Sequence, residues 1–134
     1  MTSWRYVKPI QGKTVLDQLE KDLGIKFPKS YVDCAVSNNG GRPPQSKIND
    51  DLTIKSLVHV DDSADTNILT TWAILKDRLP SKCVPFASDS FGNYFCFDFS
   101  ASGEPPVVFW DHEKMENAIE PVVDSFEKFV AMLQ

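Results

Sequence analysis

No apolar run in this sequence of 134 residues approaches the ~20 residues that a bilayer-spanning helix needs. The N-terminus also lacks the apolar stretch of a secretory signal. These two absences predict a cytoplasmic protein without a membrane partner. The three cysteines, Cys34, Cys83 and Cys96, are odd in number and irregularly spaced, which favours reduced thiols over a disulfide framework.

Catalytic motifs are also missing from the sequence. It has no G-x-S-x-G elbow, no phosphate-binding loop that opens a helix and no calcium loop. One of its two histidines, His112, stands between Asp111 and Glu113. Because successive residues of a strand point to opposite faces, these three side chains are not expected to converge on one metal ion. The sequence therefore predicts no catalytic residue, no metal and no cofactor.

Positive charge is scarce over most of the chain, whose formal net charge is −5. Residues up to Lys47 hold eight lysines and arginines against four acids, whereas the chain from Ile48 onward holds six against fifteen. This acidic majority argues against nucleic-acid binding, because phosphates are themselves negative. The acidic majority favours a basic protein partner, because complementary charge speeds the encounter of two proteins. The alternative is that the acidic surface only keeps a small protein soluble.

Aromatic residues, by contrast, are dense between Pro85 and Trp110. The segments Cys83–Ala87, Tyr94–Phe99 and Val107–Trp110 predict three strands joined by turns. In the middle strand every second residue is a phenylalanine, so the rings are expected to share one face. Such a face predicts a sheet packed against a hydrophobic core.

Apolar residues at helical spacing predict four helices, over about Thr14–Gly24, Pro28–Asn38, Asp65–Leu79 and Asp124–Leu133. Short strands or strand ends are expected at Leu52–Ile54 and Leu57–Val60. The third helix carries a stripe expected in the core, formed by Ile68, Trp72, Leu75 and Leu79. The order of elements predicts one α+β domain over residues 1–134, with a mainly antiparallel sheet packed against helices.

An acidic segment, Asp61-Asp62-Ser63-Ala64-Asp65, precedes the third predicted helix. Asp62 or Ser63 can cap that helix, because short polar side chains accept hydrogen bonds from its first amides. The alternative is a negative patch that attracts a cationic partner.

Several motifs occur together in a familiar order: Leu23-Gly24-Ile25-Lys26-Phe27-Pro28-Lys29-Ser30-Tyr31, Asn39-Gly40-Gly41, Pro85-Phe86-Ala87 with Gly92-Asn93-Tyr94-Phe95-Cys96-Phe97-Asp98, Val108-Phe109-Trp110-Asp111-His112-Glu113, and Ser125-Phe126-Glu127-Lys128-Phe129. Over about Leu16 to Leu133 the chain resembles the SUKH superfamily. Its namesakes include the yeast Smi/Knr cell-wall regulator, and its bacterial members include immunity proteins of polymorphic toxin systems.

The resemblance implies an α+β fold and a non-enzymatic role, in which bacterial relatives bind and neutralise a cognate toxin, often a nuclease. A nuclease presents a basic groove to nucleic acid, so an acidic inhibitor fits the charge count. The motif residues themselves suggest structural roles. Turns would be shaped by Gly24, Pro28, Gly40 and Gly92, while Trp110 and Phe126 would fill the core and Asp98 would end a strand.

The leading hypothesis is therefore a cytoplasmic immunity protein that binds a basic toxin domain. Asp61, Asp62, Asp111 and Glu113 are expected to contribute to its negative face. A second hypothesis is a general scaffold or regulator like the yeast namesake. A third is an enzyme that acts on a small ligand, supported by a polar cluster of Asp98, Asp111 and His112. The sequence predicts no particular oligomeric state.

Overall fold

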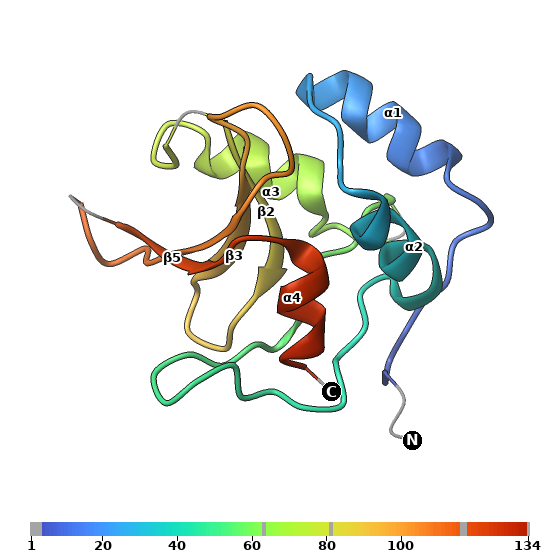
Figure 1. Cartoon of the computed structure of the whole chain (residues 1–134). Coiled ribbons are helices and arrows are strands. Elements are labelled where there is room, and N and C mark those ends of the chain that lie inside the picture. The colour runs from blue at the N-terminus through green and yellow to red at the C-terminus, as the bar shows by residue number, and fades with distance from the viewer. Residues whose placement is uncertain (1–3, 63, 81, 116–117, 134) are drawn as a thin grey trace.

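The computed structural model describes residues 4–62, 64–80, 82–115 and 118–133. Within these ranges the chain forms four helices and five strands, an α+β fold as predicted (Figure 1). In chain order they are α1 (Thr14–Leu23), α2 (Lys29–Asn38), β1 (Ser56–Leu57), α3 (Ile68–Leu75), β2 (Cys83–Ser88), β3 (Tyr94–Asp98), β4 (Val107–Trp110), β5 (Ile119–Val123) and α4 (Phe126–Ala131).

The sheet is an antiparallel meander in which each strand pairs with the next one in the sequence, from β1 to β5. The three aromatic-rich strands lie at its centre, where the sequence predicts strands. The strand β5 was not predicted, because Pro121 cannot donate a ladder hydrogen bond and reads against a strand. It is tolerated because β5 lies at the edge of the sheet.

The two predicted short strands are largely wrong. Of Leu52–Ile54, only Thr53 makes an isolated bridge, to Lys47. The strand β1 spans only Ser56–Leu57; the amide of Val58 still donates to the carbonyl oxygen of Phe86 at 2.9 Å, and His59 then pairs with the segment before α3.

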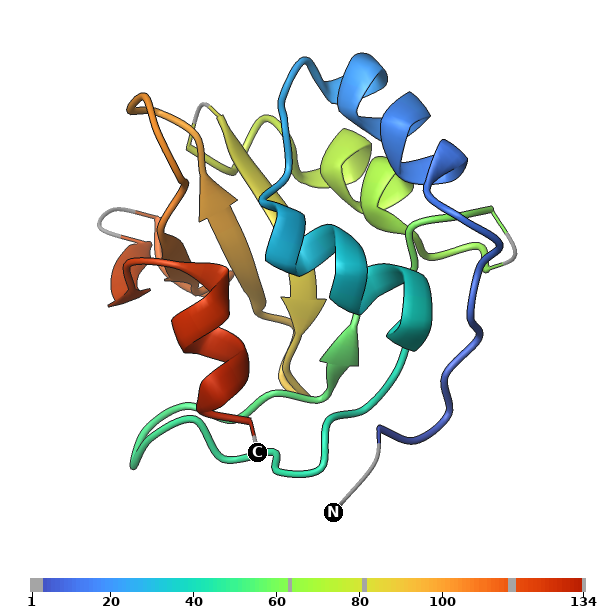
Figure 2. The same ribbon diagram turned by 45° about the vertical axis from the view of Figure 1, so that its right-hand side comes forward.

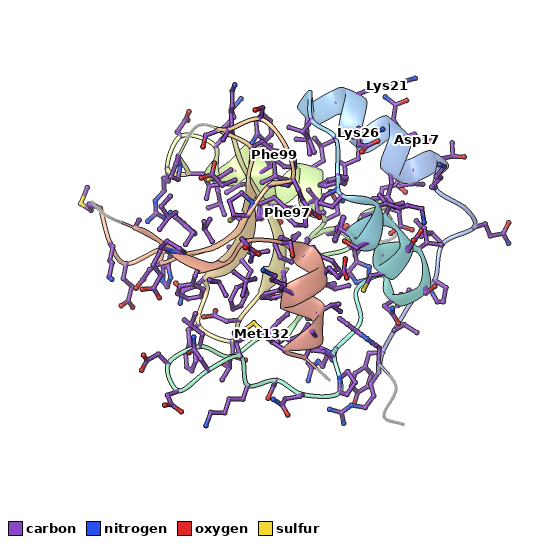
Figure 3. All side chains as sticks on the ribbon, in the orientation of Figure 1. Asp17, Lys21, Lys26, Phe97, Phe99 and Met132 are labelled. Atoms are coloured by element: carbon purple, nitrogen blue, oxygen red, sulfur yellow. The ribbon has the colours of Figure 1, made fainter. Side chains whose placement is uncertain are left out.

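One face of the sheet is covered by α2 and α4, which lie in front of the strands in Figure 2. The rings of Phe86 and Phe97 stack with their centroids 4.2 Å apart. Tyr31 from α2 approaches Phe97 at 5.1 Å, and Phe126 from α4 approaches Phe86 at 5.7 Å. Phe97 and Phe99 follow one another beside β3 in Figure 3, on the shared face that their alternation predicts.

The opposite face carries a smaller apolar cluster beside α3, formed by Leu79, Cys83, Cys96, Val108 and Trp110. The third helix is shorter than predicted, and its apolar stripe is buried at Ile68 and Leu79 but only partly buried between them. Helix α3 begins at Ile68 and ends at Leu75, and both Trp72 and Leu75 are only partly buried. The helix begins late because Asn67 closes a capping box with Thr70, whose backbone amide and hydroxyl each bond Asn67 at 3.0 Å.

Glycines of the predicted motifs lie against both histidine rings. Gly40 has φ 68°, and a Cβ atom there would lie 2.3 Å from Cε1 of His59. Gly92 has φ 89°, and a Cβ there would lie 3.2 Å from Cε1 of His112. Close approach and a left-handed backbone both require glycine at these two turns.

Candidate functional site

A groove with a volume of about 390 Å³ separates α1 from the segment that leads into α3. Figure 2 shows these two helices as neighbours at one end of the molecule. The groove is lined by Val15, Gln18, Leu19, Asp22, Val60, Asp61, Asp62, Asn67, Leu69 and Thr70. We call it the acidic groove, because three of its residues are aspartates and none is a lysine, arginine or histidine.

Helix α1 forms one wall of the acidic groove with its residues at positions 15, 18, 19 and 22. This i, i+3, i+4, i+7 spacing places them on one face of the helix. Leu19 is buried at the floor, whereas Val15 keeps 37% of its surface exposed. Opposite, Leu69 of α3 keeps 38% exposed. The groove therefore has two apolar residues at its rim, Val15 and Leu69, that remain partly exposed to solvent.

The other wall is held in place by a buried amide. Asn39 is 1% exposed, and its Oδ1 accepts a hydrogen bond from the backbone amide of Val60 at 2.8 Å. Its Nδ2 donates to Oδ1 of Asp61 and to the carbonyl oxygen of Lys8, both at 3.1 Å. Asp61 is thus fixed at the groove by a side chain from the end of α2, 22 residues earlier in the sequence.

Asp62 is exposed and does not cap α3, so that prediction is wrong; Asn67 does so instead. Ser63, the other predicted cap, lies outside the described residues. Asp22 is exposed too, and its Oδ1 accepts a hydrogen bond from Nε2 of Gln18 at 3.0 Å. Three carboxylates around two apolar rim residues suit a lysine or arginine whose aliphatic stem packs on carbon while its cation meets oxygen.

The other two predicted contact residues lie elsewhere, in the turn that follows β4. The Oδ1 of Asp111 accepts a hydrogen bond from the amide of Glu113 at 3.0 Å, and Glu113 is exposed. Neither residue is among those that line the acidic groove with Asp61 and Asp62. The structure brings together the first two predicted acids and adds Asp22 to them, which sequence reasoning missed.

A hydrogen-bonded network that was also missed joins two turns. The Oδ1 of Asn93 accepts the backbone amide of His112 at 3.0 Å and lies 2.6 Å from its Nδ1. The Nδ2 of Asn93 donates to Oδ2 of Asp89 at 2.9 Å. Both the oxygen and the nitrogen of the Asn93 side-chain amide are thus hydrogen-bonded, and the network fixes the β2–β3 turn against the β4–β5 turn.

The polar cluster proposed for an enzyme is not assembled. Tyr94 pairs with Trp110, so His112 lies near the first residue of β3. Asp98 is the last residue of that strand, four positions or roughly 13 Å away, and accepts the amide of Ser100 at 2.9 Å. A catalytic pair of Asp98 and His112 is excluded by this separation.

The cysteine thiols are poorly suited to nucleophilic chemistry. Burial raises the pKa of Cys34 to about 11, with a partly opposing hydrogen bond from Asn38. Burial, and then the charge of Asp98, raises the pKa of Cys83 to about 12. Burial also raises the pKa of Cys96 well above its usual range. Since the thiolate is the reactive form, these thiols are inert near neutral pH.

Among the residues described, no group of three or more His, Cys, Asp or Glu side chains could hold a metal ion. No helix in the described ranges has the length and apolarity to span a bilayer.

Fold and site together define a small α+β domain with a filled aromatic core and an acidic groove on its surface. The chain belongs to the SUKH family: a family model described as SMI1-KNR4 cell-wall (SUKH_6) matches residues 13–130. This confirms the resemblance drawn from the motifs. The family is generally of non-enzymatic, immunity or regulatory type. The comparison with curated proteins found no match.

Proposed function

We propose that this protein is a non-enzymatic immunity protein, acting in the cytoplasm, that binds a cognate toxin with a basic surface and blocks it. The observation that carries the proposal is the acidic groove: a concave, partly apolar surface with three aspartates and no basic side chain, in a chain of the SUKH family. A nuclease is the kind of toxin that fits best, because its substrate-binding surface must be basic.

The groove supplies the two contributions that a protein interface needs. The exposed Asp22 and Asp62 remain hydrated, so they act mainly on the rate of encounter and on its salt dependence. Burial of Val15 and Leu69 supplies affinity, at about 25 cal/mol for each Å² of apolar surface removed from water. Asp61, held by Asn39, gives the partner's cation a fixed carboxylate that loses little side-chain freedom on binding.

The first experiment is co-purification from the native host at low and moderate salt, together with identification of the neighbouring gene. We expect a secreted-toxin-like protein with a basic C-terminal domain. Its toxic domain, expressed in a test strain, should kill cells unless this chain is co-expressed. Recovery of no such partner at either salt concentration would contradict the proposal.

The second experiment assigns the contact to the groove. The double variant Asp22→Lys/Asp62→Lys reverses two exposed charges and should abolish protection. The matched control is Asp50→Lys/Asp51→Lys, which makes the same change in an exposed loop outside the groove. If both variants protect equally, the toxin binds another face. In that case Glu113→Lys, in the turn after β4, tests the other predicted contact surface.

A second candidate function is a general regulator or scaffold, because the matching family model carries a cell-wall description. This alternative predicts several endogenous partners in the co-purified fraction and no toxin gene beside this one. A single toxin-like partner that co-purifies in equal amounts would exclude it.

A further inference from the structure

A second concave surface lies on the α3 side of the sheet, over β1 and the adjoining ends of β2 and β3. It shares no lining residue with the acidic groove. Its volume is about 430 Å³. We call it the polar cleft; the residues that define it here are Lys55, Ser56, His59, Ser88, Ser90 and Tyr94. This volume falls within the ~300–1,000 Å³ range typical of small-molecule sites.

Strand register explains why hydroxyl groups line this cleft. Ser56 of β1 lies directly opposite Ser88 of β2, and Ser88 lies opposite Tyr94 of β3. Residues directly opposite one another in antiparallel strands point to the same face. Three neighbouring strands therefore place three hydroxyl-bearing side chains in one row across the sheet, and this row continues to Trp110 of β4.

The carboxylate in the cleft wall is already bonded within its own turn. The Oδ1 of Asp89 accepts the amides of Phe91 and Asn93 at 2.8 and 2.9 Å. Its Oδ2 accepts Nδ2 of Asn93 at 2.9 Å. Asp89 is buried, with 8% of its surface exposed, so its charge is compensated by three donors rather than turned toward a ligand.

The groups that remain for a ligand are mainly donors. Lys55 is exposed and is the one lysine or arginine among the residues that line the cleft, so it is the candidate for an ammonium group there. His59 also lines the cleft, but its Nδ1 is buried beside Gly40 without a hydrogen-bond partner in the described structure, so this atom is not counted among the donors for a ligand. Serine and tyrosine hydroxyls add rotatable donors. A set of donors with one cation is complementary to oxygen atoms that carry negative charge.

We propose that the polar cleft binds a small, oxygen-rich anion of the phosphate-monoester class. Lys55 pairs with the anionic group, and the row formed by Ser56, Ser88 and Tyr94 bonds its oxygens. The volume leaves room for an attached group of sugar size. This site is independent of the proposed toxin contact, so either proposal can fail alone.

The test is titration of the isotope-labelled protein with glucose 6-phosphate, inorganic phosphate and neutral glucose, followed by backbone amide chemical shifts. We expect saturable shifts at Ser56, Ser88 and Ser90 with glucose 6-phosphate, and none with glucose. Binding of inorganic phosphate with similar affinity supports recognition of the anionic group itself, whereas binding of the ester alone supports a site for the whole molecule.

Two variants assign the binding to the cleft. Lys55→Gln removes the cation, and Ser88→Val replaces a hydroxyl while suiting a strand; each should weaken binding by about tenfold, the effect of losing one charge-assisted or well-placed hydrogen bond. The control Lys26→Gln changes an exposed lysine beside α1 (Figure 3) and should change nothing. Absence of saturable shifts, equal binding of neutral glucose, or equal weakening by Lys26→Gln overturns the proposal.

Discussion

On one face of the sheet, phenylalanine rings from β2 and β3 interlock with rings from α2 and α4; on the other, two cysteines and a tryptophan lie beside the short helix α3. The first face is filled by large side chains with essentially no exposed surface, including Phe86, Phe97 and Phe126. On the second, Trp72 and Leu75 remain partly exposed. The acidic groove and the polar cleft both border α3 or the segment that leads into it.

This contrast separates stability from recognition. A face filled by interlocking rings has no room for a ligand, and every atom removed from it leaves a void. A short helix that covers only part of a sheet leaves concave borders, and polar side chains collect there. Substitutions on the aromatic face should therefore change the free energy of unfolding, while those near α3 should change binding.

The largest effect is expected from Phe97→Ala. This side chain is completely buried between Tyr31, Phe86 and Phe126, so its loss should cost about 3–5 kcal/mol of stability. Val108→Ala, on the opposite face, removes fewer buried atoms and should cost only about 1–2 kcal/mol. Urea unfolding followed by tryptophan fluorescence measures both. Equal losses would refute the difference between the faces.

A smaller loss is expected from Gly40→Ala, because the new methyl group would overlap the His59 ring and the residue has a left-handed backbone. We expect about 2–3 kcal/mol, of which about 1 kcal/mol comes from the backbone. Gly12→Ala is the matched control, with φ 70° and no atom within 4 Å of the new Cβ. The double variant Gly40→Ala/His59→Ala should recover most of the difference between the two, as thermal unfolding would reveal.

The buried thiol of Cys83 predicts a loss of stability at alkaline pH. Its pKa is raised from 9.0 to about 12, so between these values the native state holds a proton that the unfolded chain releases. Stability from this group is therefore complete below pH 9 and falls as the pH rises toward 12. Urea unfolding at a series of pH values should show a shallower alkaline decline for Cys83→Ala than for the parent. Parallel curves would contradict this.

The smallest effect on stability is expected from Asp22→Lys/Asp62→Lys, whose side chains are exposed in the acidic groove. Each change should alter the free energy of unfolding by less than about 0.5 kcal/mol, as is usual for surface positions. A larger destabilisation would mean that these acids support the fold, and loss of toxin protection could then no longer be assigned to binding.

The aromatic face was predictable because the alternation that runs through β3 and one residue beyond it places Phe95, Phe97 and Phe99 together without knowledge of any partner. Strand β5 was not, since Pro121 obscures it and only its edge position makes proline acceptable. The late start of α3 depends on the reciprocal hydrogen bonds of Asn67 and Thr70. In the sequence, Asn67 is a weaker signal for the start of a helix than Asp62 in the preceding acidic segment.

The acidic groove was half predicted. Asp61 and Asp62 were expected at a negative surface, but Asp22 lies about 40 positions earlier in the chain. Only packing of α1 beside the approach to α3 brings them together. The apolar and polar residues at positions 15, 18, 19 and 22 share a helical face, and this was the available signal. The partly buried hydrogen bond between Asn39 and Asp61 has no counterpart in any sequence pattern.

The order of strands in the sheet also bears on how the protein reaches its native state. Since each strand pairs with its successor, the hairpins from β2 to β5 can form one after another, with short loops to close. Contact between α2 and α4, from opposite ends of the chain, requires a much longer loop. We expect docking of these two helices to limit the folding rate. A chain still leaving the ribosome would therefore form its hairpins before α4 covers the phenylalanine core.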